Sequence, residues 1–259
     1  KWVAHPLQFL DSIDSTNIRA KLEAEQGAES GLLVVSDMQS AGRGRRGRGW
    51  ESPAGTNIYY TLMLKPDFSS DCAPMLTLVM ALAVAKGIRQ TLRRDSEEAA
   101  AKVGIKWPND IVVDGKKVCG ILTEMSMEQG YIQHIVIGVG INVRKQEFPE
   151  EIRDRAAAID EQCGFRISRS QLIADIMEAF EEDYEIFLRT HDLKGLRASY
   201  AELLVNQDRE VCVLDPKGEY RGIARGINDQ GELLVERQDG TVEEVYAGEV
   251  SVRGIYGYV

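Results

Sequence analysis

The chain has 259 residues, of which 44% are hydrophobic and 28% are charged. This composition is typical of a folded protein with a sizeable core, and the length permits one large domain and one small one. Lysine and arginine total 31 against 41 acidic residues, a net charge of −10, which argues against a general nucleic-acid binder.

The cysteines and the apolar runs indicate where the protein works. Cys72, Cys119, Cys163 and Cys212 lie far apart and form neither a CxxC pair nor a zinc-ligand spacing. We therefore expect free thiols and a cytoplasmic protein. The longest uncharged apolar run, Met75–Ala85, has 11 residues, fewer than the roughly 20 that span a bilayer. We expect no membrane partner and no signal peptide.

The first half of the chain predicts two helices and two strands. Asn17–Gly27 follows cap-type residues and ends on glycine, as helices do. Leu32–Ser36 and Asn57–Leu64 are apolar enough for strands. Asp71–Arg93 begins with a proline in its first turn and has a nearly all-apolar middle, which predicts a buried helix.

The next part predicts three strands and a second long helix. Val103–Lys106, Lys117–Met127 and Tyr131–Val143 are the strands, and Gln129-Gly130 supplies a hairpin turn between the last two. Ser168–Arg189 opens with a capping box and repeats its apolar residues every three or four positions, which predicts an amphipathic helix.

After about Asn206 the sequence changes character. Short apolar stretches alternate with the turn sequences Asp215–Gly218, Asn228–Gly231 and Gln238–Gly240. This spacing predicts a small all-β barrel. We therefore divide the chain into a catalytic domain of mixed α+β type over residues 1–206 and a barrel over residues 207–259.

The segment from Gln39 to Trp50 carries four glycines and four arginines. Its Gly42-x-Gly44-x-x-Gly47 spacing matches a dinucleotide fingerprint, but Pro53 and Trp50 oppose the helix which that motif requires. A basic nucleic-acid patch and a solvated loop are alternatives, and neither accounts for the glycines. We favour a clasp for a polyanionic small ligand, because arginine binds phosphates in a bidentate manner.

Three further segments agree with a nucleotide site. Lys106–Asp110 ends a strand in a rigid turn that presents an amide and a carboxylate together, although ordinary turn chemistry would also explain it. Gly138–Val143 is an apolar strand with two glycines, which signal close approach of a ligand or backbone. Gly115-Lys116 lacks the Ser or Thr of a P-loop, so ATP would need another type of site.

In this order, the segments resemble the biotin–protein ligases. The matching motifs are Asp14-Ser15-Thr16-Asn17, Gly42–Arg48, Lys106–Asp110, Lys117-x-x-Gly120-Ile121-Leu122 and Gly138-x-Gly140-Ile141-Asn142. The resemblance implies a mixed β-sheet flanked by helices, of the class II aminoacyl-tRNA synthetase-like, biotin–lipoate ligase type, followed by an SH3-like barrel. It also implies ATP and biotin as substrates with Mg²⁺, and a biotin carboxyl carrier domain, of acetyl-CoA carboxylase or a related enzyme, as protein partner. A homodimer is a further option.

The resemblance also assigns roles to residues. Those expected to bind biotin are Ser15, Thr16, Asn17, Gln39, Gly42, Arg43, Gly44, Lys117, Gly138 and Gly140. Those expected to bind the nucleotide are Arg45, Arg48, Trp50, Lys106, Asn109, Asn142 and Arg253. Arg45, Arg48, Lys117 and Asp110 would act in catalysis, and Asp110 would either assist the metal or receive a proton; no metal ligand is assigned.

Two alternatives stay open at this stage. One is a lipoate or other acyl-protein ligase of the same fold, and the other is a non-catalytic nucleotide- or RNA-binding module. Some members of the resembling family carry an N-terminal helix-turn-helix. Only about 14 residues precede Ser15 here, and they contain no DNA-binding element. Either this is the short form that has only the ligase, or the sequence is part of a longer chain; from the residues given we expect no nucleic-acid partner.

Overall fold

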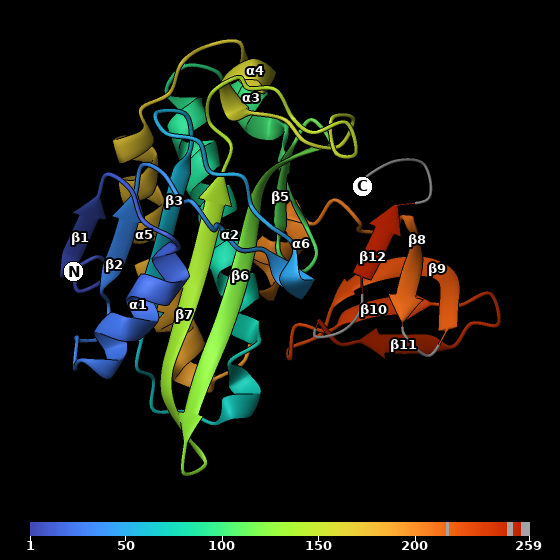
Figure 1. Cartoon of the computed structure of the whole chain (residues 1–259). Coiled ribbons are helices and arrows are strands. Elements are labelled where there is room, and N and C mark those ends of the chain that lie inside the picture. The colour runs from blue at the N-terminus through green and yellow to red at the C-terminus, as the bar shows by residue number, and fades with distance from the viewer. Residues whose placement is uncertain (216–217, 248–250, 255–259) are drawn as a thin grey trace.

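A mixed sheet forms the centre of the larger part of the chain in the computed structural model (Figure 1), which describes residues 1–215, 218–247 and 251–254. Its seven strands lie in the order β1-β2-β3-β7-β6-β5-β4. The first two strands are parallel and all other neighbours are antiparallel. The strands are β1 (Leu7–Leu10), β2 (Leu33–Ser36), β3 (Ile58–Leu64), β4 (Val103–Lys106), β5 (Asp110–Val113), β6 (Lys116–Glu128) and β7 (Tyr131–Ile141). The mixed sheet expected from the resemblance is confirmed.

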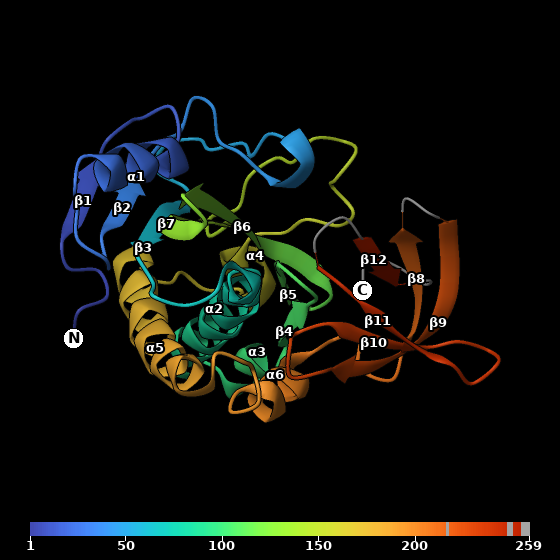
Figure 2. The same ribbon diagram turned by 90° about the horizontal axis from the view of Figure 1, so that it is seen from below.

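Helices cover both faces of this sheet. Figure 2 shows α1 (Thr16–Glu25) on one face and the long helices α2 (Met75–Arg93) and α5 (Arg169–Thr190) on the other. Helix α2 is buried along most of its length because its middle is almost entirely apolar. The segment Ser70–Arg93 is long and apolar enough to cross a membrane, but 72% of its most apolar window is buried inside the fold, as in a core helix.

The predicted elements agree closely with the structure. The Ser168 hydroxyl accepts a hydrogen bond from the Gln171 amide, so the predicted cap does begin α5. Gln129 and Gly130 both have positive φ, as a tight hairpin between β6 and β7 requires. The helix predicted over 71–93 is split into a 3₁₀ turn and α2. The short helices are η1 (Arg45–Gly47), η2 (Ser70–Cys72), α3 (Glu97–Ala101), α4 (Ile159–Cys163) and α6 (Arg197–Leu203).

The C-terminal part forms a separate five-stranded antiparallel sheet, as predicted. Its order is β11-β10-β9-β8-β12. The strands are β8 (Glu210–Asp215), β9 (Gly218–Ile227), β10 (Leu233–Glu236), β11 (Val242–Val245) and β12 (Ser251–Gly254). Pro216 and Lys217, part of one predicted turn, lie outside the described residues. The Trp107 indole donates to the Gly231 carbonyl at 3.0 Å, which fixes this sheet against the larger part.

Strand β6 is longer than its neighbour on one side. Strand β5 pairs with it only as far as Gly120, whereas β7 follows it to the end of the hairpin. Among the described strands, none pairs with the outer edge of β6 from Leu122 to Glu128. This part of the sheet therefore presents a free edge.

Candidate active site

Three glycines on β6 and β7 form a floor of bare backbone on the face that carries α1. Gly120 and Gly140 are paired across the two strands, and Gly138 lies two positions before Gly140 on the same face of β7. A Cβ at Gly138 would lie 2.8 Å from Cγ of Asn17, and one at Gly120 would lie 2.9 Å from the Trp50 ring. Strand glycines of this kind mark a close approach. Here the approaching groups are the side chains of Asn17 and Trp50.

A buried polar network stands beside this floor, where α1 begins. Gln39 Oε1 accepts hydrogen bonds from the amide and hydroxyl of Thr16, at 2.9 and 3.1 Å. The Thr61 hydroxyl on β3 lies 2.9 Å from the Thr16 hydroxyl and donates to Asn17 Oδ1 at 2.6 Å. Gln39 Nε2 donates to the Ser52 hydroxyl. Predicted residues from α1 and the following segment are thus brought into one cluster.

Ser15 occupies the N-cap position of α1. Its side chain makes no capping hydrogen bond, and the residue is buried. A serine at this position normally caps the helix. The hydroxyl is therefore placed beside Thr16 and Asn17 without being committed to the helix end, which suits a ligand-binding role.

The glycine–arginine segment folds over the same face. The Gly44 amide donates to the Arg48 carbonyl, and the Trp50 amide donates to the Gly42 carbonyl, so the segment is held partly by its own backbone. The Trp50 indole packs on the glycine floor rather than extending into solvent. Its Nε1 is buried and has no hydrogen-bond partner among the described residues.

Arg45 anchors this segment at its far end. Its Nη1 donates to Asn109 Oδ1 at 2.8 Å and its Nη2 donates to the Ala247 carbonyl at 2.7 Å. Burial lowers the pKa of Arg45, against the opposing effect of the Asp110 charge. Arg45 thus links three segments: the loop, the turn after β4 and the C-terminal sheet.

The other arginines of the segment are more exposed. Arg43 lies with Nη1 3.6 Å from Glu124 Oε1, and half of its side chain is accessible. Arg48 is exposed. Of the arginines assigned by resemblance, Arg43 and Arg45 therefore reach the sheet face or its surroundings, whereas Arg48 lies at the surface.

An ion pair lies at the other end of the floor. Lys117 Nζ, on β6, is 2.6 Å from Asp110 Oδ1 on β5 and 5.5 Å from the centre of the Trp50 ring. Lys106 lies opposite Asp110 in the backbone register of β4 and β5, and both residues are buried. A lysine, a carboxylate and an indole therefore meet where Asn109 already contacts Arg45.

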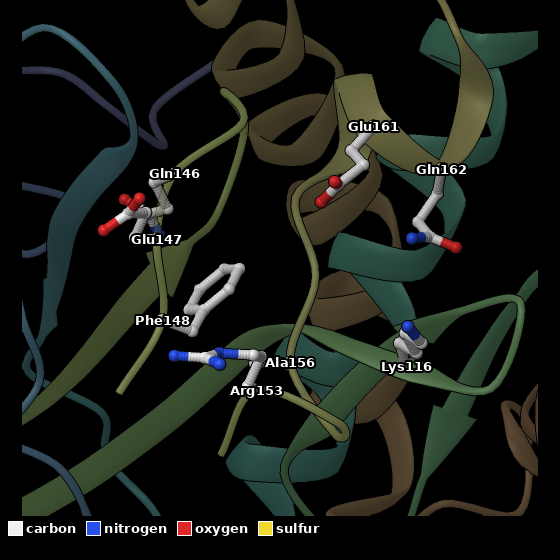
Figure 3. Close-up of a pocket in the computed structure, with 8 residues that line it drawn as sticks. All are labelled: Lys116, Gln146, Glu147, Phe148, Arg153, Ala156, Glu161 and Gln162. Atoms are coloured by element: carbon white, nitrogen blue, oxygen red, sulfur yellow. The ribbon is translucent and has the colours of Figure 1, made fainter. Parts of the chain in front are cut away.

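Asn142 is buried just past the end of β7. Its Oδ1 accepts a hydrogen bond of 3.3 Å from Gln146 Nε2. Gln146 also lines a hollow of about 520 Å³ (Figure 3), whose walls come from the start of β6, the segment after β7 and α4. The lining includes the ring of Phe148 and the charged side chains of Lys116 and Arg153. This hollow is large enough for a small ligand, and through Gln146 it adjoins Asn142, one of the predicted nucleotide residues.

The remaining predictions concern Arg253 and a metal. Arg253 lies on β12, where its backbone pairs with Cys212; its side chain lies outside the described residues. Within residues 1–215, 218–247 and 251–254, no group of three or more histidine, cysteine or acidic side chains is arranged to hold a metal ion.

Sequence reasoning missed Thr61, Lys21 and Glu124. Thr61 is fully buried in an otherwise apolar strand, and a lone polar residue in such a strand is a usable signal. Glu124 accepts from Asn17 Nδ2 at 2.8 Å and pairs with Lys21 at 2.8 Å. Only the fold shows that a helix residue and a strand residue 103 positions apart meet here.

Two sequence families match the chain. The Biotin/lipoate A/B protein ligase family matches residues 9–142, and the Biotin protein ligase C terminal domain matches residues 208–253. The first range holds most of the mixed sheet and of the candidate site but ends before α4, α5 and α6, and the second holds most of the C-terminal sheet.

Individual relatives cover nearly all of the chain. The Bifunctional ligase/repressor BirA of Bacillus spizizenii is 37% identical over 250 residues, which span 95% of this chain and 74% of that protein. The Biotin–[acetyl-CoA-carboxylase] ligase of Paracoccus denitrificans is 30% identical over 247 residues, with 93% and 100% covered. The structure of the biotin protein ligase from Aquifex aeolicus in complex with biotin and ATP superposes with a TM-score of 0.79 at 29% identity, covering 96% of this chain and 98% of that one.

Proposed function

The chain belongs to the biotin/lipoate A/B protein ligase family and is an ATP-dependent biotin–protein ligase, and we propose that the glycine floor and its surrounding side chains are the site of its chemistry. The observation that carries this proposal is the convergence on one sheet face of the Thr16–Gln39 network, Trp50 and the Lys117–Asp110 pair. These groups come from separate parts of the sequence and meet only in the fold.

The polar network suits the ureido ring of biotin. That ring presents two N–H donors and one carbonyl acceptor, so a complementary site needs both acceptors and donors. Gln39 and Thr16 supply them, and Asn17 and Ser15 stand beside them. The Asn17 side-chain amide, which stands on the backbone of Gly138, lies where the polar edge of the ring would bind. Acids that lack hydrogen-bonding groups would gain no hydrogen bond from this network.

The first chemical step joins biotin to AMP. A biotin carboxylate oxygen attacks the α-phosphorus of ATP, the bond to the bridging oxygen of pyrophosphate breaks, and pyrophosphate leaves with that electron pair. Lys117 is placed to neutralise the charge that develops at the carboxyl–phosphate junction. Arg45 would bind a phosphate through the N–H groups that do not donate to Asn109 and Ala247. Asp110 holds the Lys117 ammonium in position.

The nucleotide would lie between the arginine segment and the hollow beside Asn142. Phe148 offers a flat apolar surface for a base, and the Asn142 and Gln146 amides can hydrogen-bond to its edge. Trp50, which rests on the floor, would then cover the adenylate from the opposite side. Mg²⁺ would accompany ATP as part of the substrate, since it is usually held by phosphates and one or two carboxylates. Asp110 is the carboxylate of this site that would contact it.

The second step transfers the acyl group. The ε-amine of a carrier lysine attacks the acyl carbon of biotinyl-AMP, AMP leaves, and the nitrogen loses a proton. We propose a biotin carboxyl carrier domain of acetyl-CoA carboxylase or a related enzyme as the acceptor. The free edge of β6 beyond Gly120 would serve carrier docking or pairing into a homodimer.

The division of labour between the two parts of the chain is also a proposal. Residues 1–206 would form the catalytic domain and 207–259 a barrel that supports it through Ala247 and Gly231. All four cysteines are free thiols, which suits a reducing cytoplasm.

A pyrophosphate-release assay tests the proposed activity. Purified protein is given Mg²⁺ and ATP with biotin, with lipoate, or with no acid. Biotin alone should stimulate release, and a carrier domain should then become labelled on lysine. Stimulation by lipoate instead would indicate the lipoate-ligase alternative, and no acid-dependent release would indicate a non-catalytic nucleotide- or RNA-binding protein.

A further inference from the structure

Glu124 is a charged residue on β6 that faces α1 at the end of the glycine floor. Its Oε2 accepts a hydrogen bond from Asn17 Nδ2 at 2.8 Å, and its Oε1 lies 2.8 Å from Lys21 Nζ and 3.6 Å from Arg43 Nη1. Burial raises the pKa of Glu124, but the hydrogen bonds from Asn17 and Lys21 and the charges of Lys21 and Arg43 outweigh it, so the net pKa is lowered. The carboxylate is therefore ionised at neutral pH.

The first consequence concerns the Asn17 side chain. An amide can be turned either way, and its neighbours decide which end presents the oxygen. Glu124 can only accept when ionised, so it holds Nδ2 of Asn17, while the Thr61 hydroxyl donates to Oδ1. Glu124 thus fixes the orientation of the amide that stands on Gly138.

The second consequence concerns the glycine–arginine segment. Arg45 fastens the far end of this segment to Asn109 and Ala247. The contact between Arg43 and Glu124 reaches the sheet from the near end. Glu124 lies seven positions after Lys117 on the same strand, roughly 23 Å away at the usual rise per residue. The segment is therefore tied down at both ends of the floor.

We propose that Glu124 is a positioning residue for the biotin pocket: its carboxylate orients Asn17 and holds Arg43 against β6, which closes the pocket at the end remote from Lys117. This inference rests on the proposed function of the floor as the biotin site. Glu124 does not contact the reacting atoms. Loss of its carboxylate should therefore weaken biotin binding and leave the chemical step almost unchanged.

The test is Glu124→Gln, which keeps the shape and one oxygen but removes the charge. KM for biotin in the pyrophosphate-release assay should rise about 3- to 10-fold, the size expected for one charged contact, while kcat stays within about 2-fold. The matched control is Glu182→Gln, an exposed carboxylate on α5, which should change neither constant. An unchanged KM, or a lower kcat with normal KM, would overturn the proposal.

A double-mutant cycle separates positioning from a general effect on the fold. Arg43→Gln alone should also raise KM for biotin, and the double variant with Glu124→Gln should be clearly less impaired than the product of the two single effects, because the residues share one contact. If the two single increases in KM multiply in the double variant, Glu124 does not act through Arg43. Glu124→Asp, which keeps the charge, should lie between wild type and Glu124→Gln. If pyrophosphate release by the wild type does not depend on biotin, the proposed function itself is wrong.

Discussion

The Trp50 indole rests directly on the backbone of Gly140, so close that a Cβ at that glycine would lie 2.9 Å from Cζ2 of the ring. The same ring covers Gly120 on the neighbouring strand, with Lys117 Nζ above it. The indole can therefore pack here only because Gly120 and Gly140 have no side chains. A methyl group at either glycine must displace the ring, because no flexible side chain separates it from the floor.

The first prediction follows from this packing of the indole. Gly140→Ala should lift Trp50 and the segment that carries it, and a displacement of about 1 Å at a reacting centre costs about 100-fold in rate. Biotin-dependent pyrophosphate release should fall by about that factor. The tryptophan emission should also shift, since Trp50 is one of three tryptophans and would become more exposed. Unchanged emission together with an unchanged rate would show that the floor tolerates a side chain.

The second prediction concerns adenylate formation. Arg45→Ala removes the guanidinium that contacts Asn109 and Ala247, and Lys117→Ala removes the ammonium held by Asp110. Each should slow biotinyl-AMP synthesis by ~10²–10³-fold, the range for one preorganised donor. Rapid-quench measurement of adenylate in the absence of carrier isolates this step. Lys102→Ala removes an exposed surface cation that pairs with Glu98 and serves as the control. Normal adenylate synthesis by both Arg45→Ala and Lys117→Ala would remove their assigned roles.

Much of the fold could be predicted because each element carries a local signal. The strand predicted over Val103–Lys106 matches β4 residue for residue, and the hairpin after β6 follows from Gln129-Gly130. Strands β1 and β5 were missed. The pairing of β1 with β2 and of β5 with β4 and β6 decides their structure more than their own sequence does.

The candidate site could be predicted only where a motif is contiguous. Thr16, Asn17 and Arg45 stand in recognisable motifs, and the structure brings them to one face or its border. Glu124 belongs to no such motif, and its place beside Asn17 depends on the register of β6 with β7 and on how α1 packs across them. Shifting that register by one residue would turn Glu124 to the opposite face.

The third prediction concerns the free edge of β6. Met125 and Met127 are 40% and 46% exposed along this edge. An arginine at either position should weaken pairing of the edge with another chain and leave adenylate synthesis intact, because a charge on an edge opposes pairing. Sedimentation and carrier-transfer kinetics would report the change. Leu188→Arg is a control at similar exposure on α5; sedimentation and transfer identical to wild type in both methionine variants would remove the role of this edge.

The fourth prediction is a pH dependence of stability. His134 on β7 is buried, both its ring nitrogens lack a hydrogen-bond partner among the described residues, and burial lowers its pKa. In the unfolded chain His134 takes up a proton at about pH 6.5, whereas in the folded protein it does so only at a lower pH. The free energy of unfolding therefore falls as the pH drops below about 6.5. Urea unfolding at pH 7.5 and 5.5 should show this loss for wild type and less of it for His134→Leu. Equal losses would assign the dependence to other groups.

The last prediction is that the glycine–arginine segment opens without ligand and closes over biotinyl-AMP. Its glycines give it a large backbone entropy, and its arginines repel one another until an anion arrives. In the closed arrangement Trp50 and Arg45 restrain the backbone of the segment. Arg46 and Arg48 have exposed side chains, so trypsin can cleave after them once the segment opens and its backbone becomes free to enter the protease. Trypsin should therefore cut here rapidly in the free protein and much more slowly with biotin plus ATP, but not with ATP alone, because only the adenylate reaches both ends of the floor. Closure would also shield the anhydride from water between the two steps. Equal cleavage under all three conditions would show that the segment does not respond to its ligand.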